Sequence, residues 1–450
     1  MLFQITTAQL TPDAAGMRLT SHGHRLGSMT TNEPRPGQDQ HGRPSSGQGQ
    51  LPQQANPTWL GHVEPVYYQQ APANNSGRFQ PALPPAAPTV TGGRGSAGGS
   101  GLVPAGFFLA FMSLFLVLPF LLERTGIAGF VVGFIASLIP LGTVLLTVLF
   151  IDRWEPEPRP LLLFAFVWGA AVSIAVTMLL QPYFSLVAGP VSGLDYATFA
   201  VTVQAPVVEE FAKSLGLLSL LLFAPRHFDG PVDGVVFAFT IAAGFAFTEN
   251  ILYFGRAIAE SSDPGTDLAV VFFLRGVMSP FAHAIFTGTT GLIMGFAARR
   301  GNDGLVVLAF VVGVVPSMVL HSGWNSMGQD FLGQYLLVQV PIFLLAVLVI
   351  AWLRVAERRF TRQRLREYAA AGWFTVAEVD MLATTGGRRN ALRWAKSVGR
   401  GAQMKALLRA ATRLAFTRQR ILSGRDVPTY QLEEQHRLAE IAALRAAVVG

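Results

Sequence analysis

The fold of this 450-residue chain is decided by a long apolar stretch, residues 104–151, whose sequence is PAGFFLAFMSLFLVLPFLLERTGIAGFVVGFIASLIPLGTVLLTVLFI. Its only charged residues are Glu123 and Arg124, near the middle. A helix needs about 20 residues to cross the roughly 30 Å of hydrocarbon in a bilayer. The stretch is therefore long enough for two membrane spans, which we place at 104–122 and 127–151.

Further apolar runs follow and extend this pattern along the chain. They are continuous in Leu, Val, Phe and Ala and lack the alternation of outer-membrane strands. We therefore predict an all-α fold, a polytopic transmembrane helix bundle of about eight spans. The six further spans are expected at 161–186, 199–224, 232–255, 269–297, 303–322 and 335–354.

The composition supports a membrane protein and limits its chemistry. Charged residues make up 14% of the chain, whereas a soluble domain has about 25%. The chain contains no cysteine, which excludes disulfides, Cys-ligated zinc, iron–sulfur clusters and thiol nucleophiles. Any chemistry must come from oxygen and nitrogen side chains.

Two polar regions flank the predicted membrane domain, 104–354. Residues 1–100 are rich in Pro, Gly, Gln and Ser and show no sustained periodicity, which predicts a disordered tail. Residues 355–450 are basic and show helical spacing of apolar residues, which predicts amphipathic helices. Their basic faces could lie on anionic lipid headgroups or be solvated. No nucleic-acid-binding motif accompanies the charge, so we expect no nucleic-acid partner.

The short loops predict an orientation. Arginines cluster in the second, fourth and sixth loops, and the odd loops contain fewer. By the positive-inside rule the even loops are cytoplasmic, and with eight spans both tails are cytoplasmic too. We expect a multi-pass protein of a bacterial cell membrane. The even loops contain Arg153, Arg159, Arg226, Arg299 and Arg300, and the odd loops contain Arg124 and Arg256.

Ionisable residues inside the spans are the strongest functional signal. The fourth span contains Glu209, Glu210 and Lys213, although one charge at a helix centre costs about 2.5–3.5 kcal/mol on the insertion scale. Lys213 lies one turn from both acids, so an ion pair with either could lower this cost. One carboxylate would then be paired and the other left free to titrate.

The next three spans contain further polar groups. Glu249, Asn250 and Tyr253 lie in the fifth span, and His283 lies halfway along the sixth, before the glycine-rich stretch with Gly288, Gly291 and Gly295. The seventh span ends with His321 and Asn325 at i and i+4. A lone histidine, Asn250 or Tyr253 could be a packing residue, but acids and imidazoles on four successive spans indicate a functional site beside water.

Two chemistries are open to this set of residues. Glu209 or Glu210 could act as general base on water, a histidine could orient that water or protonate a leaving amine, and Asn325 could donate to an oxyanion. The same groups could instead bind zinc, with His283, His321 and Glu209 as a His₂Glu site. The HExxH pattern is absent. The residues alone do not separate the two mechanisms.

The motifs EExxK (Glu209, Glu210, Lys213), ENxxY (Glu249, Asn250, Tyr253), His283 and HxxxN (His321, Asn325) resemble those of the PrsW family of intramembrane proteases in order and spacing. The segment DRWEPEPRPLLLFAFVWG resembles that family's first loop and following helix. The resemblance covers about residues 105–355. The related CAAX prenyl endopeptidases have Arg one residue after the position of Lys213, so prenylated substrates are not implied.

The resemblance implies a helical membrane peptidase of the group that includes CAAX prenyl endopeptidases and bacteriocin-immunity proteins. Glu209 and Glu210 would activate water, His283 and His321 would be catalytic or metal-binding, and Asn325 would be the oxyanion donor. Family members are commonly called metalloproteases, which leaves zinc open. The implied partner is a membrane-anchored protein substrate, and in PrsW itself this is an anti-sigma factor cut on the outer side.

A different class of protein, a proton-coupled transporter, would also place Glu, His and Lys inside membrane helices. Against it, the spans show no inverted repeat and the ionisable groups cluster in the middle four helices. A non-catalytic scaffold is the third alternative.

Overall fold

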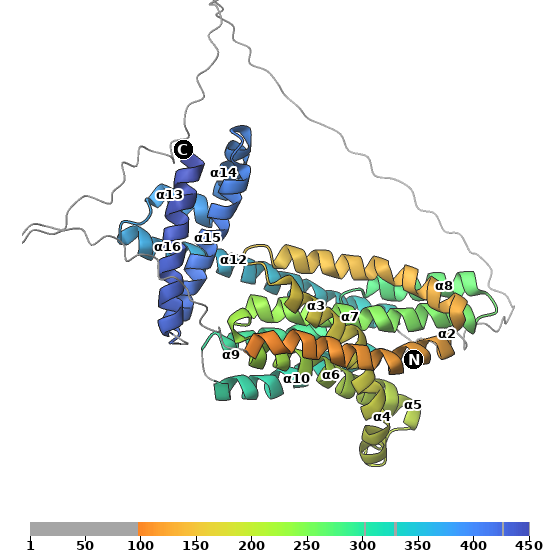
Figure 1. Cartoon of the computed structure of the whole chain (residues 1–450). Helices are drawn as coiled ribbons and strands as arrows, with labels where there is room; N and C mark the ends of the chain where they lie inside the picture. The colour runs from red at the N-terminus through yellow and green to blue at the C-terminus, as the bar shows by residue number, and fades with distance from the viewer. Residues whose placement is uncertain (1–97, 301–302, 328–330, 425–426, 450) are drawn as a thin grey trace, which may run out of the picture. The chain divides into compact units, whose positions relative to one another are not determined.

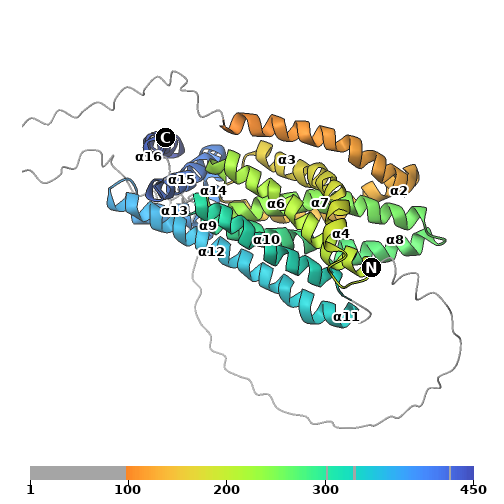
Figure 2. The same ribbon diagram turned by 90° about the horizontal axis from the view of Figure 1, so that it is seen from below.

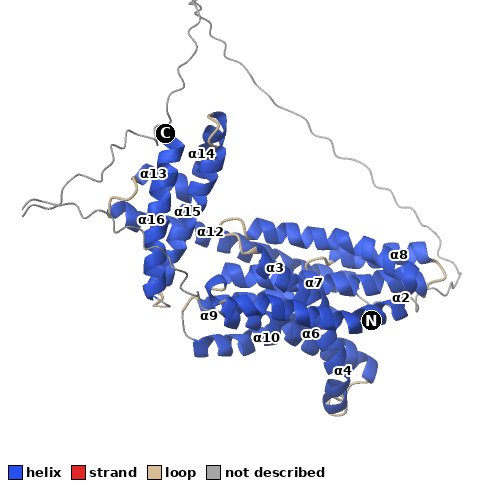
Figure 3. Cartoon of the chain, viewed as in Figure 1, coloured by secondary structure: helices blue, strands red, loops and turns tan. Residues whose placement is uncertain are grey.

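The computed structural model describes residues 98–300, 303–327, 331–424 and 427–449 (Figure 1). The predicted tail, 1–100, lies outside these residues except for its last three positions, which begin helix α2 (Gly98–Ile151). In the described part every regular element is a helix and none is a strand (Figure 3). This confirms the predicted all-α fold.

Helix α2 consists of two arms that meet at Gly126. This residue has φ of 62°, in the left-handed region that glycine adopts without steric cost. After the turn, an added Cβ on Gly133 would contact the Ile251 carbonyl, and Val148 packs with Val235. The second arm therefore runs antiparallel to helix α7 (Pro231–Ala259), and α2 contains both of the first two predicted spans.

Six helical stretches among the described residues are long and apolar enough to cross a membrane. The sequence predicted about eight spans, and the difference arises at two places. The two arms of α2, which correspond to the first two predicted spans and meet at Gly126, form a single one of these six stretches. Helix α6 (Ala205–Phe223) contains three charged residues and is therefore less apolar than an ordinary span.

The other membrane helices follow the predicted order, and several are extended by short π-helical turns. The sixth predicted span, 269–297, is interrupted at 279–281, because the residue before a proline, here Pro280, avoids helical geometry. The elements are α3 (Arg159–Val167), η3 (Trp168–Ser173), α4 (Ile174–Ala188), α5 (Tyr196–Phe199), η4 (Ala200–Gln204), α8 (Pro264–Phe272), η6 (Phe273–Met278), α9 (Ala282–Ala298), α10 (Asp303–Asn325), α11 (Phe331–Gln334), η7 (Tyr335–Gln339) and α12 (Val340–Ala370).

Glycines bring α9 against α7. A Cβ added to Gly291 would lie 2.1 Å from the Gly234 carbonyl oxygen, and one added to Gly295 would lie 2.4 Å from the Gly230 carbonyl oxygen. Gly288 similarly accommodates the ring of Phe239. These backbones are closer than any side chain allows, so the contact fixes the register of α9 on α7.

The region after the last span is helical, as predicted, and its helices bury a core of their own. Met404, Leu414 and Ala395 have no exposed surface. Thr375 and Glu378 form a capping box at the start of α13, which satisfies two backbone N–H groups. The elements of this region are α13 (Val376–Ala383), α14 (Thr385–Ser397), α15 (Gly401–Leu422) and α16 (Val427–Val449), whereas the short η5 (Pro225–His227) lies between α6 and α7.

Candidate active site

The predicted acids and imidazoles meet at one place, where α6, α7, α9 and α10 lie side by side (Figures 1 and 2). Each of the four helices contributes acidic or histidine side chains from the face that it turns toward the other three. Helix α6 presents two consecutive glutamates, α7 presents one, and α9 and α10 present one histidine each. The site is therefore assembled from segments that are up to about a hundred residues apart in the chain.

Glu210 lies at the buried centre of the cluster and has no exposed surface. Its Oε1 accepts hydrogen bonds from Lys213 Nζ and from His321 Nδ1, the latter at 3.0 Å. Its Oε2 accepts from Thr287 Oγ1 at 2.9 Å and from Ser317 Oγ at 2.7 Å. Four donors satisfy this carboxylate, which makes it an anchor that orients His321.

The predicted ion pair on α6 therefore forms between Lys213 and Glu210 rather than Glu209. The ammonium of Lys213 also lies 3.2 Å from His283 Nδ1 and 4.3 Å above the ring of Phe245. A fully buried lysine requires such partners, because a lone buried charge is unstable. Lys213 thus links α6 to α9.

Glu249 holds the second histidine. Its Oε2 lies 2.8 Å from His283 Nε2 and accepts from Arg275 Nη2 at 2.5 Å. The Nε of Arg275 donates to Asn250 Oδ1 at 2.8 Å, and its guanidinium lies 4.0 Å from the centre of the Tyr253 ring. The ENxxY motif of α7 therefore surrounds Arg275 of η6, a residue that none of the sequence motifs includes.

Glu209 differs from the other two acids because its Oε2 has no hydrogen-bond partner among the described residues, although the atom is buried. This oxygen lies 3.9 Å from His321 Nε2. The side chains of Glu209, His283 and Glu249 keep 10%, 12% and 16% of their surface exposed. These three side chains form the side of the cluster that keeps some exposed surface, whereas Glu210 and Lys213 have none.

The two imidazoles stand face to edge, with ring centroids 5.1 Å apart and planes at 90°. Each imidazole is hydrogen-bonded to a carboxylate through one ring nitrogen. His321 uses Nδ1 to bond Glu210, and His283 uses Nε2 to bond Glu249. One ligand atom from each of Glu209, His283 and His321 lies within 4.8 Å of the others. This is the predicted His₂Glu set.

Asn325 does not join the cluster that the sequence predicted for it. Helix α10 does continue through Gly323, but the Asn325 amide donates to the Val201 carbonyl at 2.9 Å. Ser322 makes a similar bond to the Thr202 carbonyl. Both acceptors lie in the π-helical turn η4, so this end of α10 ties the start of α6 in place.

Sequence reasoning also missed the hydroxyls of Thr287 and Ser317. Each lies four residues from a predicted histidine, Thr287 after His283 and Ser317 before His321. This spacing, one helical turn, was the available signal. It is weak, because hydroxyls in membrane helices commonly bond the carbonyl of the preceding turn, as Thr289 does with Ile285.

Comparisons with known proteins agree with this geometry. Residues 157–352 match the family model described as PrsW family intramembrane metalloprotease. The chain is 28% identical over 221 residues to Protease PrsW of Clostridioides difficile, covering 49% of this chain and 86% of that protein. Identity to Protease PrsW of Oceanobacillus iheyensis is 27% over 215 residues, covering 47% and 89% respectively.

Protease PrsW of Bacillus subtilis is 26% identical over 178 residues, which is 39% of this chain and 72% of that protein. No solved structure matches the chain significantly. The matched residues contain all four helices that build the cluster. The membrane domain of this chain belongs to the PrsW family of intramembrane proteases.

Proposed function

We propose that Glu209, His283 and His321 form the catalytic centre of a membrane endopeptidase that cuts membrane-anchored protein substrates. The observation that supports this most directly is the free Glu209 carboxylate oxygen, 3.9 Å from His321 Nε2. Every other acid in the cluster is held by several donors. An unpartnered buried carboxylate is costly, and its retention beside two imidazoles indicates a group that acts on a substrate or on water.

The hydrogen bonds predict a site for the attacking water. If His321 donates its Nδ1–H to Glu210, its Nε2 is an acceptor, as is Glu209 Oε2. A water that gives one hydrogen to each acceptor, at the usual distance of about 2.7–2.8 Å, can bridge the 3.9 Å gap. Its oxygen lone pair then faces the carbonyl of the substrate, and Glu209 takes the proton as general base.

The other side of the cluster is suited to the leaving group. Glu249 and Lys213 hold the His283 ring on both of its nitrogens. To protonate the leaving amine, His283 would transfer the Nε2 proton that it shares with Glu249, and the Lys213 ammonium could replace that proton through Nδ1. Asn325 was expected to donate to the oxyanion, and we now assign it to the positioning of η4, because its amide is bonded to Val201.

The residues also fit a zinc ion. A zinc-bound histidine usually donates its other N–H to a carboxylate, and Glu210 and Glu249 accept from His321 and His283 in this way. Zinc would be held by Glu209, His283 and His321, provided that the Lys213 ammonium leaves His283 Nδ1. When bound, zinc would polarise the scissile carbonyl and lower the pKa of water.

The substrate class and the location are part of the proposal. The chain is a multi-pass membrane protein, so a membrane-anchored protein is the substrate with access to residues inside the bundle. A membrane-anchored anti-sigma factor is the first candidate, from the resemblance to PrsW. The arginine-rich loops favour the bacterial cell membrane with both tails in the cytoplasm. No observation among the described residues favours the transporter alternative.

The test uses the full chain in detergent or liposomes with a single-pass membrane peptide. Glu209→Gln keeps the shape of the side chain and removes the base, so we expect cleavage to fall by about 10²–10⁴-fold. The matched control is Glu260→Gln, an exposed acid paired with Arg256 at the far end of α7. Cleavage that persists in Glu209→Gln, His283→Ala and His321→Ala would exclude this centre.

The same samples distinguish catalysis by Glu209 and the histidines alone from catalysis that requires zinc. We expect either about one zinc per wild-type chain, lost in His321→Ala, or no zinc with activity that resists chelators. Metal content is measured directly by elemental analysis and does not depend on finding the right substrate. Lys213→Met separates the cases further, because removing the ammonium from His283 Nδ1 should increase zinc retention if zinc is a ligand of this site.

A further inference from the structure

Helix α12 presents one continuous stripe that changes from apolar to basic. Its first half exposes Leu345, Leu348, Trp352 and Val355, with 60%, 66%, 56% and 37% of their surfaces exposed. These positions repeat every three or four residues, so they lie on one face of the helix. Because this face belongs to a membrane span, it faces lipid.

The same spacing continues beyond the apolar residues into Arg359, Arg362 and Arg366. Trp352 is typical of the membrane–water interface. At 1.5 Å per residue, Arg359 lies about 10 Å further along the helix and Arg366 about 21 Å. The arginines therefore begin at the depth of the lipid headgroups, at the edge of the hydrocarbon core.

Two of the three guanidinium groups have no partner among the described residues. Arg362 donates to Asp380 Oδ1, through Nε at 3.0 Å and Nη2 at 2.5 Å. Arg359 and Arg366 are exposed and have no hydrogen-bond or ion-pair partner in the part of the chain that the structure describes. Two unpaired cations seven residues apart on one face form an anion-binding surface.

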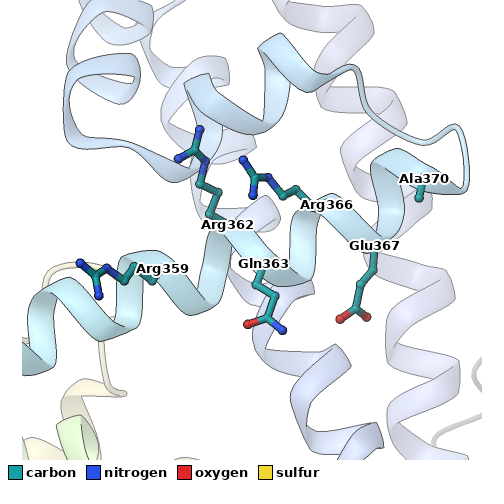
Figure 4. A pocket seen from close by; sticks show the side chains of 6 residues that line it. All are labelled: Arg359, Arg362, Gln363, Arg366, Glu367 and Ala370. Carbon is teal, nitrogen blue, oxygen red and sulfur yellow. The ribbon is translucent and has the colours of Figure 1, made fainter.

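These residues also line an open cavity of about 500 Å³. Figure 4 shows Arg359, Arg362 and Arg366 along successive turns of α12, with Gln363 and Glu367 pointing to the other side in this view. The acid in the lining does not cancel the charge, because Glu367 is already paired with Arg364 and with Arg418 Nε at 3.1 Å. The cavity keeps a net positive lining.

We propose that this stripe, Arg359, Arg362 and Arg366, is a binding site for the phosphate group of an anionic membrane lipid. Guanidinium groups bind phosphate oxygens in a bidentate manner. Basic clusters directly after a membrane span attract anionic lipid by this chemistry. A free phosphate offers the same group, but only a lipid also places its acyl chains along Leu348 and Trp352, on the same face of the helix.

The test measures lipid binding by the full chain in neutral detergent, with native mass spectrometry or thermophoresis. The probes are short-chain phosphatidylglycerol, short-chain phosphatidylcholine and inorganic phosphate. We expect Arg359→Gln/Arg366→Gln to weaken phosphatidylglycerol binding about 30-fold, since each arginine near an anionic surface contributes about fivefold. The control is Lys405→Gln/Arg409→Gln, two exposed basic residues four apart on α15, which should leave the affinity unchanged.

Three results would overturn the proposal. The first is equal binding of phosphatidylcholine and phosphatidylglycerol, and the second is an equal loss of affinity in the control variant. The third is inorganic phosphate binding as tightly as the lipid, which would make the ligand a free anion. If the double variant is not recovered in folded form, each single variant is expected to lose about fivefold. Binding is measured without proteolysis, so this test does not depend on the proposed protease activity.

Discussion

Glu210 and Lys213 form an ion pair in which neither side chain has any surface exposed to solvent. The two residues are one turn apart on α6, inside the membrane domain. Breaking a buried pair by removing one partner typically costs about 3–5 kcal/mol, because the other charge is left uncompensated. Removing both partners costs less, because no lone charge then remains.

This relationship predicts a non-additive pair of mutations. Lys213→Met should lower the melting temperature in detergent strongly, by an amount that corresponds to about 3–5 kcal/mol. The double variant Glu210→Gln/Lys213→Met should be more stable than Lys213→Met alone. Thermal unfolding of the single and double variants tests this coupling. A double variant that is less stable than both single variants would show that the pair is not the dominant interaction.

Arg275 is predicted to be a positioning residue that acts through Glu249. It donates to Glu249 at 2.5 Å, and the same carboxylate oxygen holds His283 at 2.8 Å. Removing a group that orients a ligating or catalytic side chain costs about 10–100-fold in activity. We therefore expect Arg275→Gln to lower kcat by this factor with little change in KM.

Rescue by charge distinguishes positioning from packing. Arg275→Lys retains one donor for Glu249 and should recover part of the activity, although it cannot also reach Asn250 as Arg275 does. Arg256→Gln is the control, since this arginine is paired with Glu260 at the exposed end of α7. Equal activity of Arg275→Gln and Arg275→Lys would contradict the assigned role.

The sequence was sufficient to predict the fold and most of the cluster. Apolar run length predicts membrane helices reliably, because the bilayer imposes a length that short runs cannot meet. Ionisable residues inside those runs indicate a functional site because they are costly to place in the bilayer. This cost is why Glu209, Glu210, Glu249, His283 and His321 were all identified. Their convergence follows from helical register and the alternation of spans.

The partners of these groups could not be predicted, because they depend on tertiary contacts. Ser317 and Thr287 bond Glu210, which lies 107 and 77 residues away in the chain. Asn325 was expected in the cluster on spacing alone, but the Val201 carbonyl, 124 residues away, takes its amide. Spacing within a helix predicts which residues share a face of that helix. It does not predict which residues of other helices contact that face.

The loop after α2 predicts a pH-dependent stability. Burial raises the pKa of Asp152 to about 7, although the Glu157 backbone N–H and Arg354 act against this. The folded state then holds a proton that the unfolded state has released between about pH 4 and pH 7, so stability falls as pH rises through this window. Burial also raises the pKa of Glu155, to about 8, which acts in the same direction.

Melting temperatures measured between about pH 5 and pH 8 test this sign. Wild type should become less stable as pH rises, and Asp152→Asn should show a smaller fall, because asparagine keeps an acceptor for the Glu157 N–H and cannot ionise. Glu260→Gln, which changes an exposed acid, should follow the wild-type curve. Identical pH dependence of wild type and Asp152→Asn would contradict the prediction.

The contact between α7 and α9 predicts a link from packing to catalysis. A methyl group on Gly291 would lie 2.1 Å from the Gly234 carbonyl oxygen and 2.7 Å from the Ala238 Cβ, so the helices must separate in Gly291→Ala. Overpacking of this kind costs about 1–3 kcal/mol. Because His283 lies on α9 and Glu249 on α7, the separation should also lengthen their 2.8 Å contact and lower cleavage.

Gly142→Ala is the matched control, because the added methyl on α2 would lie within 4 Å of no atom of the described residues other than the adjacent backbone of its own helix. It should leave cleavage unchanged and raise stability slightly, since alanine is favoured over glycine within helices by about 1 kcal/mol. The informative comparison is between activity and stability in Gly291→Ala. If its melting temperature falls while cleavage by the remaining folded protein stays at the wild-type rate, α9 can shift without moving His283, and close helix packing does not set the geometry of the site.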